Sequence, residues 1–302
     1  MLAKSASSVK QWTATLTDNE PLSILWCREF SYMPQDFTAS VLRNTDLGHG
    51  NFLLDFEEVA GLREMRPGQF FMIGIPGSAT LLRRPYSVCG LPGTFSDSPV
   101  NSVQVLYKVL GQGTGLLAAL GAGATISVLG PLGRGFEPPP QHGARPVFVA
   151  GGIGSAPFPA LQAMLRKGHP APLMFYGARN AGELALREWF DEHTQELVLT
   201  TDDGSAGRRG FVTEPLAELL SRSAPDSLHL YGCGPEPMLK ALARLAREHG
   251  TPCDLALEAH MACGFGVCLG CVVPTRHGED GEVRYERVCV EGPVMKAGVL
   301  AW

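Results

Sequence analysis

Four cysteines near the C-terminus have a spacing that is typical of an iron–sulfur cluster. Four residues separate Cys263 from Cys268, two separate Cys268 from Cys271, and seventeen precede Cys289. A tight loop that supplies three thiolates, with a fourth from a distant segment, is the plant-type arrangement for [2Fe-2S]. Glycines inside the loop would let the backbone wrap closely and turn amide groups toward the sulfurs. We therefore predict that these four cysteines bind a [2Fe-2S] cluster.

A zinc site with four cysteine ligands is the main alternative. Such sites usually pair two C-x2-C knuckles, and this sequence has one. The spacing therefore favours iron and sulfide. Cys27, Cys89 and Cys253 are predicted to be small buried hydrophobic residues.

A second candidate site is the segment Arg83–Ser87, which follows an apolar run and a Gly/Pro turn. An Arg can fork onto a pyrophosphate, a Tyr can stack on a flat ring, and a Ser can hydrogen-bond a ring nitrogen. Further on, Gly111–Gly115 precedes the helix-like Leu116–Leu120, and amides at a helix start attract phosphate. Each signal alone is weak, because basic turns and glycine-rich turns are usually just solvated turns.

Two glycine-containing turns follow apolar runs later in the chain. The run ending at Ala150 is followed by GGIGSAP, which begins with Gly151, Gly152 and Gly154. A strand, a glycine turn and a helix start suit a dinucleotide pyrophosphate, although the pattern is not a strict G-x-G-x-x-G. The run ending at Tyr231 is followed by a second turn, whose residues are Gly232, Cys233, Gly234 and Pro235. The alternatives are plain βα turns and a buried thiol.

The elements that must position these residues fall into three groups. Short apolar runs separated by turn signals predict an antiparallel β-barrel over 36–142, with strands at Phe52–Phe56, Gln69–Ile75, Val103–Val109 and Thr125–Leu129. Strands alternating with helices predict a doubly wound α/β domain over 143–256, with strands at Pro146–Ala150, Leu173–Tyr176, Leu197–Thr200 and Leu228–Tyr231 and helices at Phe158–Arg166, Glu183–Glu192, Glu214–Arg222 and Pro237–His249. Residues 257–302 form a small C-terminal cluster domain, and residues 1–35 an extension without a clear period. The fold class is therefore multidomain α+β.

Composition narrows the function. The 302 residues are 45% hydrophobic and 18% charged, which suits a packed globular protein. The net charge of −5 argues against a nucleic-acid partner. The uncharged stretches Pro146–Leu165 and Leu116–Gly133 are broken by Gly and Pro, so no membrane span is expected. With no apolar signal segment at the start, we expect a cytoplasmic protein without disulfides.

Taken in order, the Arg84, Gly113 and Cys233 segments resemble the ferredoxin reductase superfamily. The resemblance implies FAD contacts from an R-x-Y-S segment, from the strand after it and from a G-T loop. The residues that match these are Arg84, Pro85, Tyr86, Ser87, Leu106, Tyr107, Lys108, Gly113 and Thr114. It also implies that the C-G-P motif lies beside the nicotinamide, which makes Cys233 the candidate catalytic residue. The two glycine turns would then bind NAD.

The tail from Glu258 to Pro293 looks more specifically like the electron-transfer subunit of type B dihydroorotate dehydrogenase, and the resemblance covers about residues 36–298. It implies an NAD-linked oxidoreductase subunit of pyrimidine biosynthesis that carries FAD and one [2Fe-2S] cluster. It also implies a partner subunit with FMN and the pyrimidine site, in a heterotetramer. The long extension and the wide gap before Cys289 depart from the family pattern, and a longer hairpin around His277–Glu282 would absorb the gap.

The three cofactors have a chemical order. A nicotinamide transfers a pair of electrons and a [2Fe-2S] cluster takes one, so a flavin belongs between them. Because no acid–base pair for pyrimidine chemistry is recognisable, substrate oxidation falls to the partner. Part of the cysteine loop would then form an apolar patch that contacts the partner. The alternative is that its apolar side chains only shield the sulfurs from water. These side chains are Met261, Ala262, Phe265, Val267 and Leu269. The alternatives are an NAD(P)H-ferredoxin or sulfide-linked reductase subunit and a non-enzymatic cluster-bearing sensor.

Overall fold

The computed structural model describes residues 34–59, 62–141, 143–166, 168–278 and 281–302. The extension predicted over residues 1–35 therefore falls outside the described residues except for its last two, and Cys27 lies with it. The residues from Pro34 to Trp302 belong to one compact unit.

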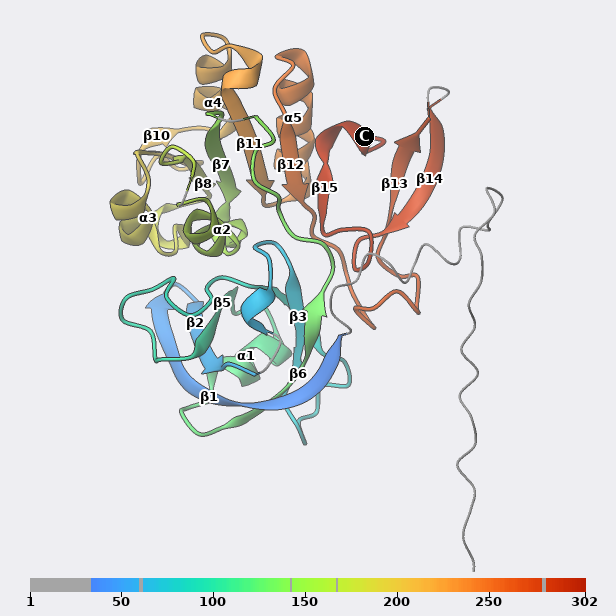
Figure 1. Cartoon of the computed structure of the whole chain (residues 1–302). Coiled ribbons are helices and arrows are strands. Elements are labelled where there is room, and N and C mark those ends of the chain that lie inside the picture. Colours follow the sequence, from blue (N-terminus) through green and yellow to red (C-terminus); the bar gives the residue numbers. More distant parts are fainter. Residues whose placement is uncertain (1–33, 60–61, 142, 167, 279–280) are drawn as a thin grey trace, which may run out of the picture. The chain divides into compact units, whose positions relative to one another are not determined.

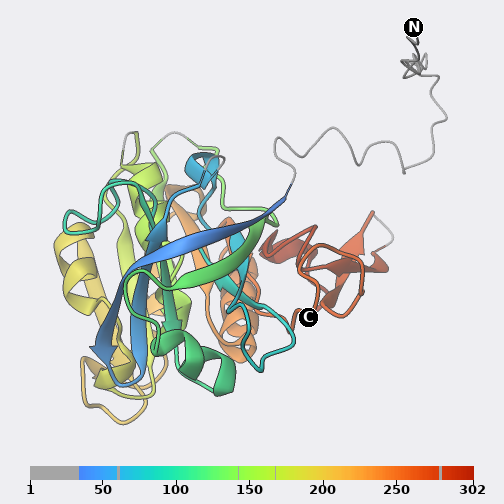
Figure 2. The same cartoon turned by 90° about the horizontal axis from the view of Figure 1, so that it is seen from below.

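The first sheet has six antiparallel strands in the order β4-β3-β6-β1-β2-β5 (Figures 1 and 2). Their bounds are β1 Gln35–Gly48, β2 Asn51–Glu57, β3 Phe70–Gly74, β4 Arg84–Ser87, β5 Ser102–Lys108 and β6 Thr125–Leu132. The segment after β4 turns toward β5, where the Cys89 amide donates to the Gln104 carbonyl at 2.8 Å and the Gln104 amide donates to the Gly90 carbonyl at 2.9 Å. The two edges of the sheet thus nearly meet, and the predicted antiparallel barrel is confirmed.

The four predicted barrel strands are present with ends shifted by a few residues, whereas no strand was predicted for β1 or β4. In β1 only Ala39 and Val41 are buried among fourteen residues, so the strand has no apolar run. Figure 2 shows it crossing the barrel as a long, bent ribbon. In β4, Tyr86 alone is buried, and its neighbours form the predicted flavin segment. A short helix, α1 (Gln112–Ala118), follows β5.

The second sheet has seven strands in the order β10-β9-β8-β7-β11-β12-β15. All its neighbours pair in parallel except β12 and β15, which are antiparallel. The strands are β7 Arg145–Gly151, β8 Leu173–Ala178, β9 Glu196–Thr201, β10 Arg208–Arg209, β11 Leu228–Cys233, β12 Cys253–Ala256 and β15 Val294–Lys296. The helices are α2 Phe158–Leu165, α3 Arg187–His193, α4 Thr213–Leu220 and α5 Glu236–Glu248, with 3-10 turns at η2 Leu62–Glu64, η3 Gly152–Ser155, η4 Ala181–Glu183, η5 Pro225–Ser227 and η6 Ala297–Val299.

Alternate residues of the central strands face two different cores, as in a doubly wound fold. Phe148 and Ala150 of β7 pack in one core with α2 and α3, whereas Val147 and Val149 pack in the other with α4 and α5. The parallel order turns back at β7 and β11, so the glycine turns after these strands lie side by side. The predicted helix at Glu183–Glu192 begins too early, because η4 occupies its first residue and α3 starts at Arg187.

The C-terminal residues form a hairpin and the last strand of the second sheet. Strands β13 (Val272–His277) and β14 (Glu282–Arg287) pair antiparallel, which confirms the hairpin expected in the wide gap before Cys289. Strand β15 then joins the edge of β12. The small C-terminal domain is therefore attached to the α/β sheet, and its buried residues belong to the same core as Leu239 and Leu255.

Candidate functional site

The four predicted cluster ligands come together as two pairs. Cys263 and Cys268 form one pair, in which the Cys268 amide donates to the Cys263 sulfur at 3.5 Å. Cys271 and Cys289 form the other, with hydrogen-bonded thiols, and the Val288 amide donates to the Cys271 carbonyl at 2.9 Å. The first pair reaches the surface and the second is buried.

This pairing fits a two-iron cluster, in which each iron takes two thiolates. Among the residues that the structure describes, no group of three or more His, Cys, Asp or Glu side chains is placed to hold one metal ion. Charge on Cys263 also acts on Cys289, so the two pairs lie near each other. The arrangement of the four thiols in two pairs therefore fits [2Fe-2S].

The two pairs differ in electrostatics. Partial burial opposes ionisation of Cys263, but the amides of Cys268, Phe265 and Val267 outweigh it and lower the pKa of the thiol to about 6. Burial and the neighbouring Cys271 raise the pKa of Cys289 to about 12. The loop amides thus stabilise negative charge on sulfur, as the sequence predicted, whereas the buried pair needs a cation to hold two thiolates.

The cysteine loop packs directly on the barrel. Gly264 has a φ of +80°, and a Cβ there would lie 2.4 Å from Cγ of Met72 in β3 and 3.4 Å from Cδ1 of Leu132 in β6. Met72 is fully buried and pairs across the sheet with Pro85 of the predicted flavin segment. Met72 is therefore in contact with the cluster loop and adjacent to β4.

Residues of the predicted flavin segment line a small pocket. Its lining residues are Ile73, Gly74, Ile75, Thr80, Leu82, Arg84, Tyr86, Gly113 and Leu117. The Arg84 guanidinium lies beside Gly113, where a Cβ would meet it at 3.5 Å. Arg84 also donates to the Leu82 carbonyl. A guanidinium beside a glycine suits a pyrophosphate, because its paired N–H groups can donate to two phosphate oxygens. The pocket also brings together two segments that are distant in the sequence.

The aromatic residues beside this pocket are held rigidly. Tyr86 and Tyr107 pack edge to face with ring centroids 5.9 Å apart, and burial raises the pKa of both phenols, that of Tyr107 to about 12. The Tyr107 hydroxyl donates to Asn44 Oδ1 at 3.1 Å, while Asn44 Nδ2 donates to the Leu117 carbonyl at 2.9 Å. Pro85 and Ser87 lie half-buried on β4.

Two other predicted flavin residues have structural partners of their own. Leu106 is buried in a small core with Ala156 and Ala185. Thr114 caps α1, since its Oγ1 accepts from the Gly111 amide at 3.1 Å and also donates to the Gly111 carbonyl at 3.0 Å. The contacts of Leu106 and Thr114 are therefore those of core packing and helix capping.

Lys108 bridges the barrel and the α/β domain. Its Nζ lies 2.8 Å from Glu183 Oε1, and the two side chains are only 17% and 14% exposed. Glu183 also pairs with Arg179, and Arg179 and Lys108 together lower the pKa of Glu183 to about 2. Nearby, Asn51 Nδ2 donates to the Gly182 carbonyl at 3.1 Å. The predicted flavin-lining lysine is therefore engaged in an ion pair between the two domains.

The two glycine turns predicted to bind NAD pack against each other. A Cβ on Gly154 would lie 2.3 Å from the Cys233 carbonyl oxygen, and one on Gly151 would lie 2.7 Å from Cδ of Pro235. A Cβ on Gly234, whose φ is +155°, would lie 2.9 Å from the Gly151 nitrogen. Only glycine permits this approach of the two turns at the ends of β7 and β11. Gly152, at a φ of +54°, faces open space.

The remaining residues of the second turn are buried. Gly232 makes room for Leu242 and Leu255, so its role is core packing. Burial and the charge of Glu258 raise the pKa of the Cys233 thiol, which is therefore neutral at physiological pH. Glu258 is exposed at the surface, yet desolvation of its carboxyl by the surrounding protein raises its pKa too. Sequence reasoning gave Glu258 no role; its position just after β12, the neighbour of β11, was the available signal.

Residues near the ends of β8 and β9 make local contacts. The Tyr176 hydroxyl donates to Ser155 Oγ at 3.0 Å, and Asp203 Oδ1 accepts from the Ser205 amide at 2.9 Å. Asp203 therefore acts as a turn former. Within the described ranges, no helix is long and apolar enough to cross a membrane.

Comparisons with known proteins agree with this geometry. Residues 258–301 match the family model of the iron-sulfur cluster binding domain of dihydroorotate dehydrogenase B, and residues 148–244 match the oxidoreductase NAD-binding domain. The dihydroorotate dehydrogenase B (NAD(+)) electron transfer subunit of Caldanaerobacter subterraneus subsp. tengcongensis is 37% identical over 259 residues, which cover 86% of this chain and 96% of that protein. The subunit of the same name from Clostridium perfringens is 35% identical, covering 86% and 95%.

Solved structures show the same fold. A structure of NADH-dependent reduced ferredoxin-NADP oxidoreductase has a TM-score of 0.72 and 26% identity, covering 87% of this chain and 90% of that one. A ferredoxin NADP+ reductase from Neisseria gonorrhoeae with bound FAD and NADP has a TM-score of 0.58 at 19% identity, covering 71% and 92%.

Replacing Cys268 tests the cluster. Wild-type protein purified without oxygen should contain about two irons and two acid-labile sulfides per chain. Cys268→Ser should lose them and keep FAD, because the flavin pocket is built from barrel residues. Cys253→Ala, which removes a buried thiol on β12, should retain both. Stoichiometric zinc without iron in the wild-type protein would contradict the assignment.

The contact between Gly264 and Met72 gives a second prediction. Gly264→Ala combines a left-handed φ with a clash at 2.4 Å, so it should destabilise the fold and lower the cluster content. Gly123→Ala is the matched control, because its φ of +83° is similar but nothing lies within 4 Å. The control should lose only about 1–2 kcal/mol from the backbone conformation. Equal unfolding free energies and equal iron content in the two variants would show that the contact is unimportant.

Proposed function

Because the chain belongs to the family of dihydroorotate dehydrogenase B (NAD(+)) electron transfer subunits, we propose that it moves electrons between NAD and a partner subunit that oxidises dihydroorotate. FAD and one [2Fe-2S] cluster, both bound by this chain, form the route. The partner carries FMN and the pyrimidine site, and the complex is a heterotetramer. The full reaction therefore requires both subunits, whereas this chain alone has flavin reductase activity.

One observation supports this proposal above the others: the three predicted segments adjoin one another. The cysteine loop touches Met72 of β3, and β3 pairs with β4, which carries Arg84 and Tyr86. Leu106 of β5, the predicted flavin-lining strand, shares a small core with Ala156, next to the first glycine turn. Such an arrangement serves electron transfer and has no evident use in a protein that only binds a cluster.

When bound, FAD can exchange an electron pair with the nicotinamide and pass single electrons to a [2Fe-2S] cluster. Arg84, which lies beside Gly113, would bind the FAD pyrophosphate, and Tyr86, packed against Tyr107, would line the flavin site. The glycine turns at Gly151 and Gly234 would bind NAD at the ends of their strands. Cys233, a neutral buried thiol, would act on the nicotinamide as a weak hydrogen-bond donor.

Each cofactor is assigned to one of the domains predicted from the sequence. We assign FAD to residues 36–142, NAD to 143–256 and the cluster to 257–302, in a cytoplasmic enzyme. A related subunit that serves ferredoxin or a sulfide-linked enzyme would share these cofactors. Identification of the subunit that co-purifies with the chain, and of its cofactor, tests this assignment: a partner without FMN or dihydroorotate oxidation would refute it. A chain that failed to reduce a dye with NADH would instead be a non-enzymatic sensor.

Arg84 gives the test of the flavin pocket. Loss of a charge-assisted contact costs roughly 1.5–3 kcal/mol, or about tenfold to a hundredfold in affinity. Arg84→Ala should therefore purify with substoichiometric FAD, measured by absorbance and by titration of the apoprotein. Arg83→Ala is the control, since Arg83 pairs instead with Asp36 and Ser127 outside the pocket. Unchanged FAD affinity in Arg84→Ala would remove Arg84 from the site.

The partner contact is expected on the cysteine loop. Phe265, Val267 and Leu269 are 50%, 72% and 61% exposed, whereas Met261 packs against the core. The loop thus presents an apolar surface beside the cluster, and the shielding role falls mainly to buried residues. A surface of this kind suits a protein that must receive electrons at short range.

Phe265→Glu should separate contact from shielding. The variant should keep its NADH–dye activity and its cluster spectrum, and it should lose dihydroorotate:NAD activity with the partner because a charge would be buried in the contact. Val100→Glu, at a residue that is 87% exposed between β4 and β5, should change neither activity. Loss of the cluster in Phe265→Glu would favour shielding, and normal coupling would exclude Phe265 from the interface.

A further inference from the structure

Arg287 connects the two segments that carry the cysteines. It is the last residue of β14 and stands two residues before Cys289. Its Nη1 donates to the Gly266 carbonyl of the cysteine loop at 3.4 Å. A Cβ on Gly266 would lie 3.2 Å from the same nitrogen, so the loop packs on the guanidinium.

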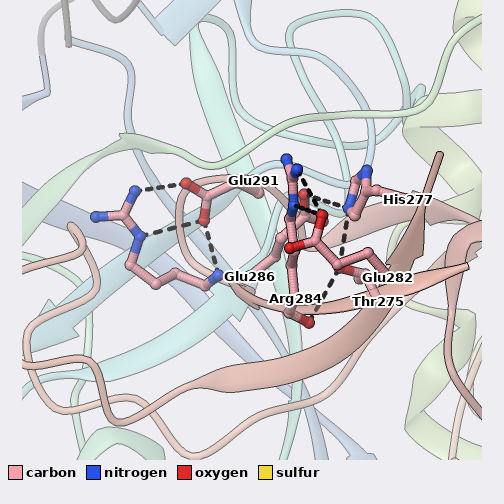
Figure 3. A network of polar contacts seen from close by, with 7 residues as sticks. Thr275, His277, Glu282, Arg284, Glu286 and Glu291 are labelled. Carbon is pink, nitrogen blue, oxygen red and sulfur yellow. Dashed lines mark hydrogen bonds and ion pairs between the residues drawn. The ribbon is translucent and has the colours of Figure 1, made fainter. Parts of the chain in front are cut away.

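Glu291, which follows Cys289 by two residues in the sequence, hydrogen-bonds this guanidinium. Its Oε2 accepts from the Arg287 amide at 2.7 Å and from Nε at 3.2 Å, and its Oε1 pairs with Nη2. The Glu291 amide in turn donates to the Arg287 carbonyl at 2.9 Å. The two side chains are only 18% and 25% exposed, and Glu291 is separate from the exposed Glu282 and Arg284 of the hairpin (Figure 3).

The pair lies close to the second pair of cluster ligands along the chain. Arg287 pairs across the hairpin with Val272, the residue after Cys271, and Glu291 stands two residues after Cys289. The guanidinium and the carboxylate hydrogen-bond each other, so a cation and an anion are both held beside these two cysteines.

We propose that Arg287 and Glu291 set the reduction potential of the [2Fe-2S] cluster, with Arg287 favouring the reduced state and Glu291 opposing it. Reduction adds one electron, and hence one negative charge, to the cluster. A nearby cation stabilises that charge and a nearby anion destabilises it, and local charge is one of the factors that fix such potentials. Arg287 is also a positioning residue, because it ties the loop to the segment of Cys289. This inference rests on the proposed function, which supplies the cluster.

Charge-removing variants of the two residues should shift the potential in opposite directions. In an EPR-monitored redox titration at pH 8, Arg287→Gln should lower the midpoint potential and Glu291→Gln should raise it. We expect changes on the order of tenfold in the ratio of reduced to oxidised cluster, or about 59 mV for one electron. The double variant should lie between the two. Shifts of the same sign, or no shift, would overturn the proposal.

The chain offers a matched control on the same strand. Arg284 and Glu282 form an ion pair at 2.8 Å, but their side chains are 56% and 62% exposed. Arg284→Gln and Glu282→Gln should leave the potential unchanged, because solvent screens their charges. A shift as large as that of the Arg287 and Glu291 variants would show that net charge alone is responsible, against the proposal.

Iron and sulfide content separates failure of the inference from failure of the proposed function. Wild-type protein without a [2Fe-2S] cluster would contradict the function. If Arg287→Gln loses the cluster, two other variants test the proposal. Glu291→Gln should raise the midpoint potential of the cluster. Arg287→Lys, which keeps the positive charge, should have a midpoint potential near the wild-type value. Failure of either expectation in a cluster-loaded variant would overturn the role of the pair.

Discussion

One continuous apolar core is the constraint on which the rest of the structure depends. It contains Met72 and Leu132 of the barrel, Leu255 of the parallel sheet, and Cys271 and Cys289 of the C-terminal domain. Two of the four predicted cluster ligands are thus core residues as well. Side-chain packing therefore fixes the predicted cluster ligands relative to the predicted flavin strand, and the C-terminal domain cannot move without exposing apolar surface.

The parts of the site with strong local signals could be predicted from the sequence. Thiolate spacing is set by the geometry of a tight loop, so Cys263 and its partners were recognisable. The glycines after β7 and β11 were recognisable because close backbone approach excludes a side chain. The strands that hold the site were harder to predict, since β1 buries only Ala39 and Val41 and depends on pairing with distant strands.

The contacts that individual side chains make in the fold could not be predicted from the sequence. Thr114 and Gly232 stand in segments that match a superfamily pattern, yet Thr114 caps α1 and Gly232 makes room for core leucines. A motif identifies a segment of the sequence, whereas the fold determines which side chains of that segment can face a ligand. Met72 and Glu258 illustrate the reverse case, because each is ordinary in sequence and becomes relevant only through its neighbours in space.

The ion pair between Lys108 and Glu183 has a consequence for behaviour on heating. It joins the barrel to the nucleotide domain through two side chains that are largely withdrawn from solvent. The hydration that competes with such a pair weakens as temperature rises, whereas apolar stabilisation per unit area levels off. The link between the two domains should thus become relatively more important in warm conditions. The proposed flavin and nicotinamide sites would keep their mutual orientation as other contacts loosen.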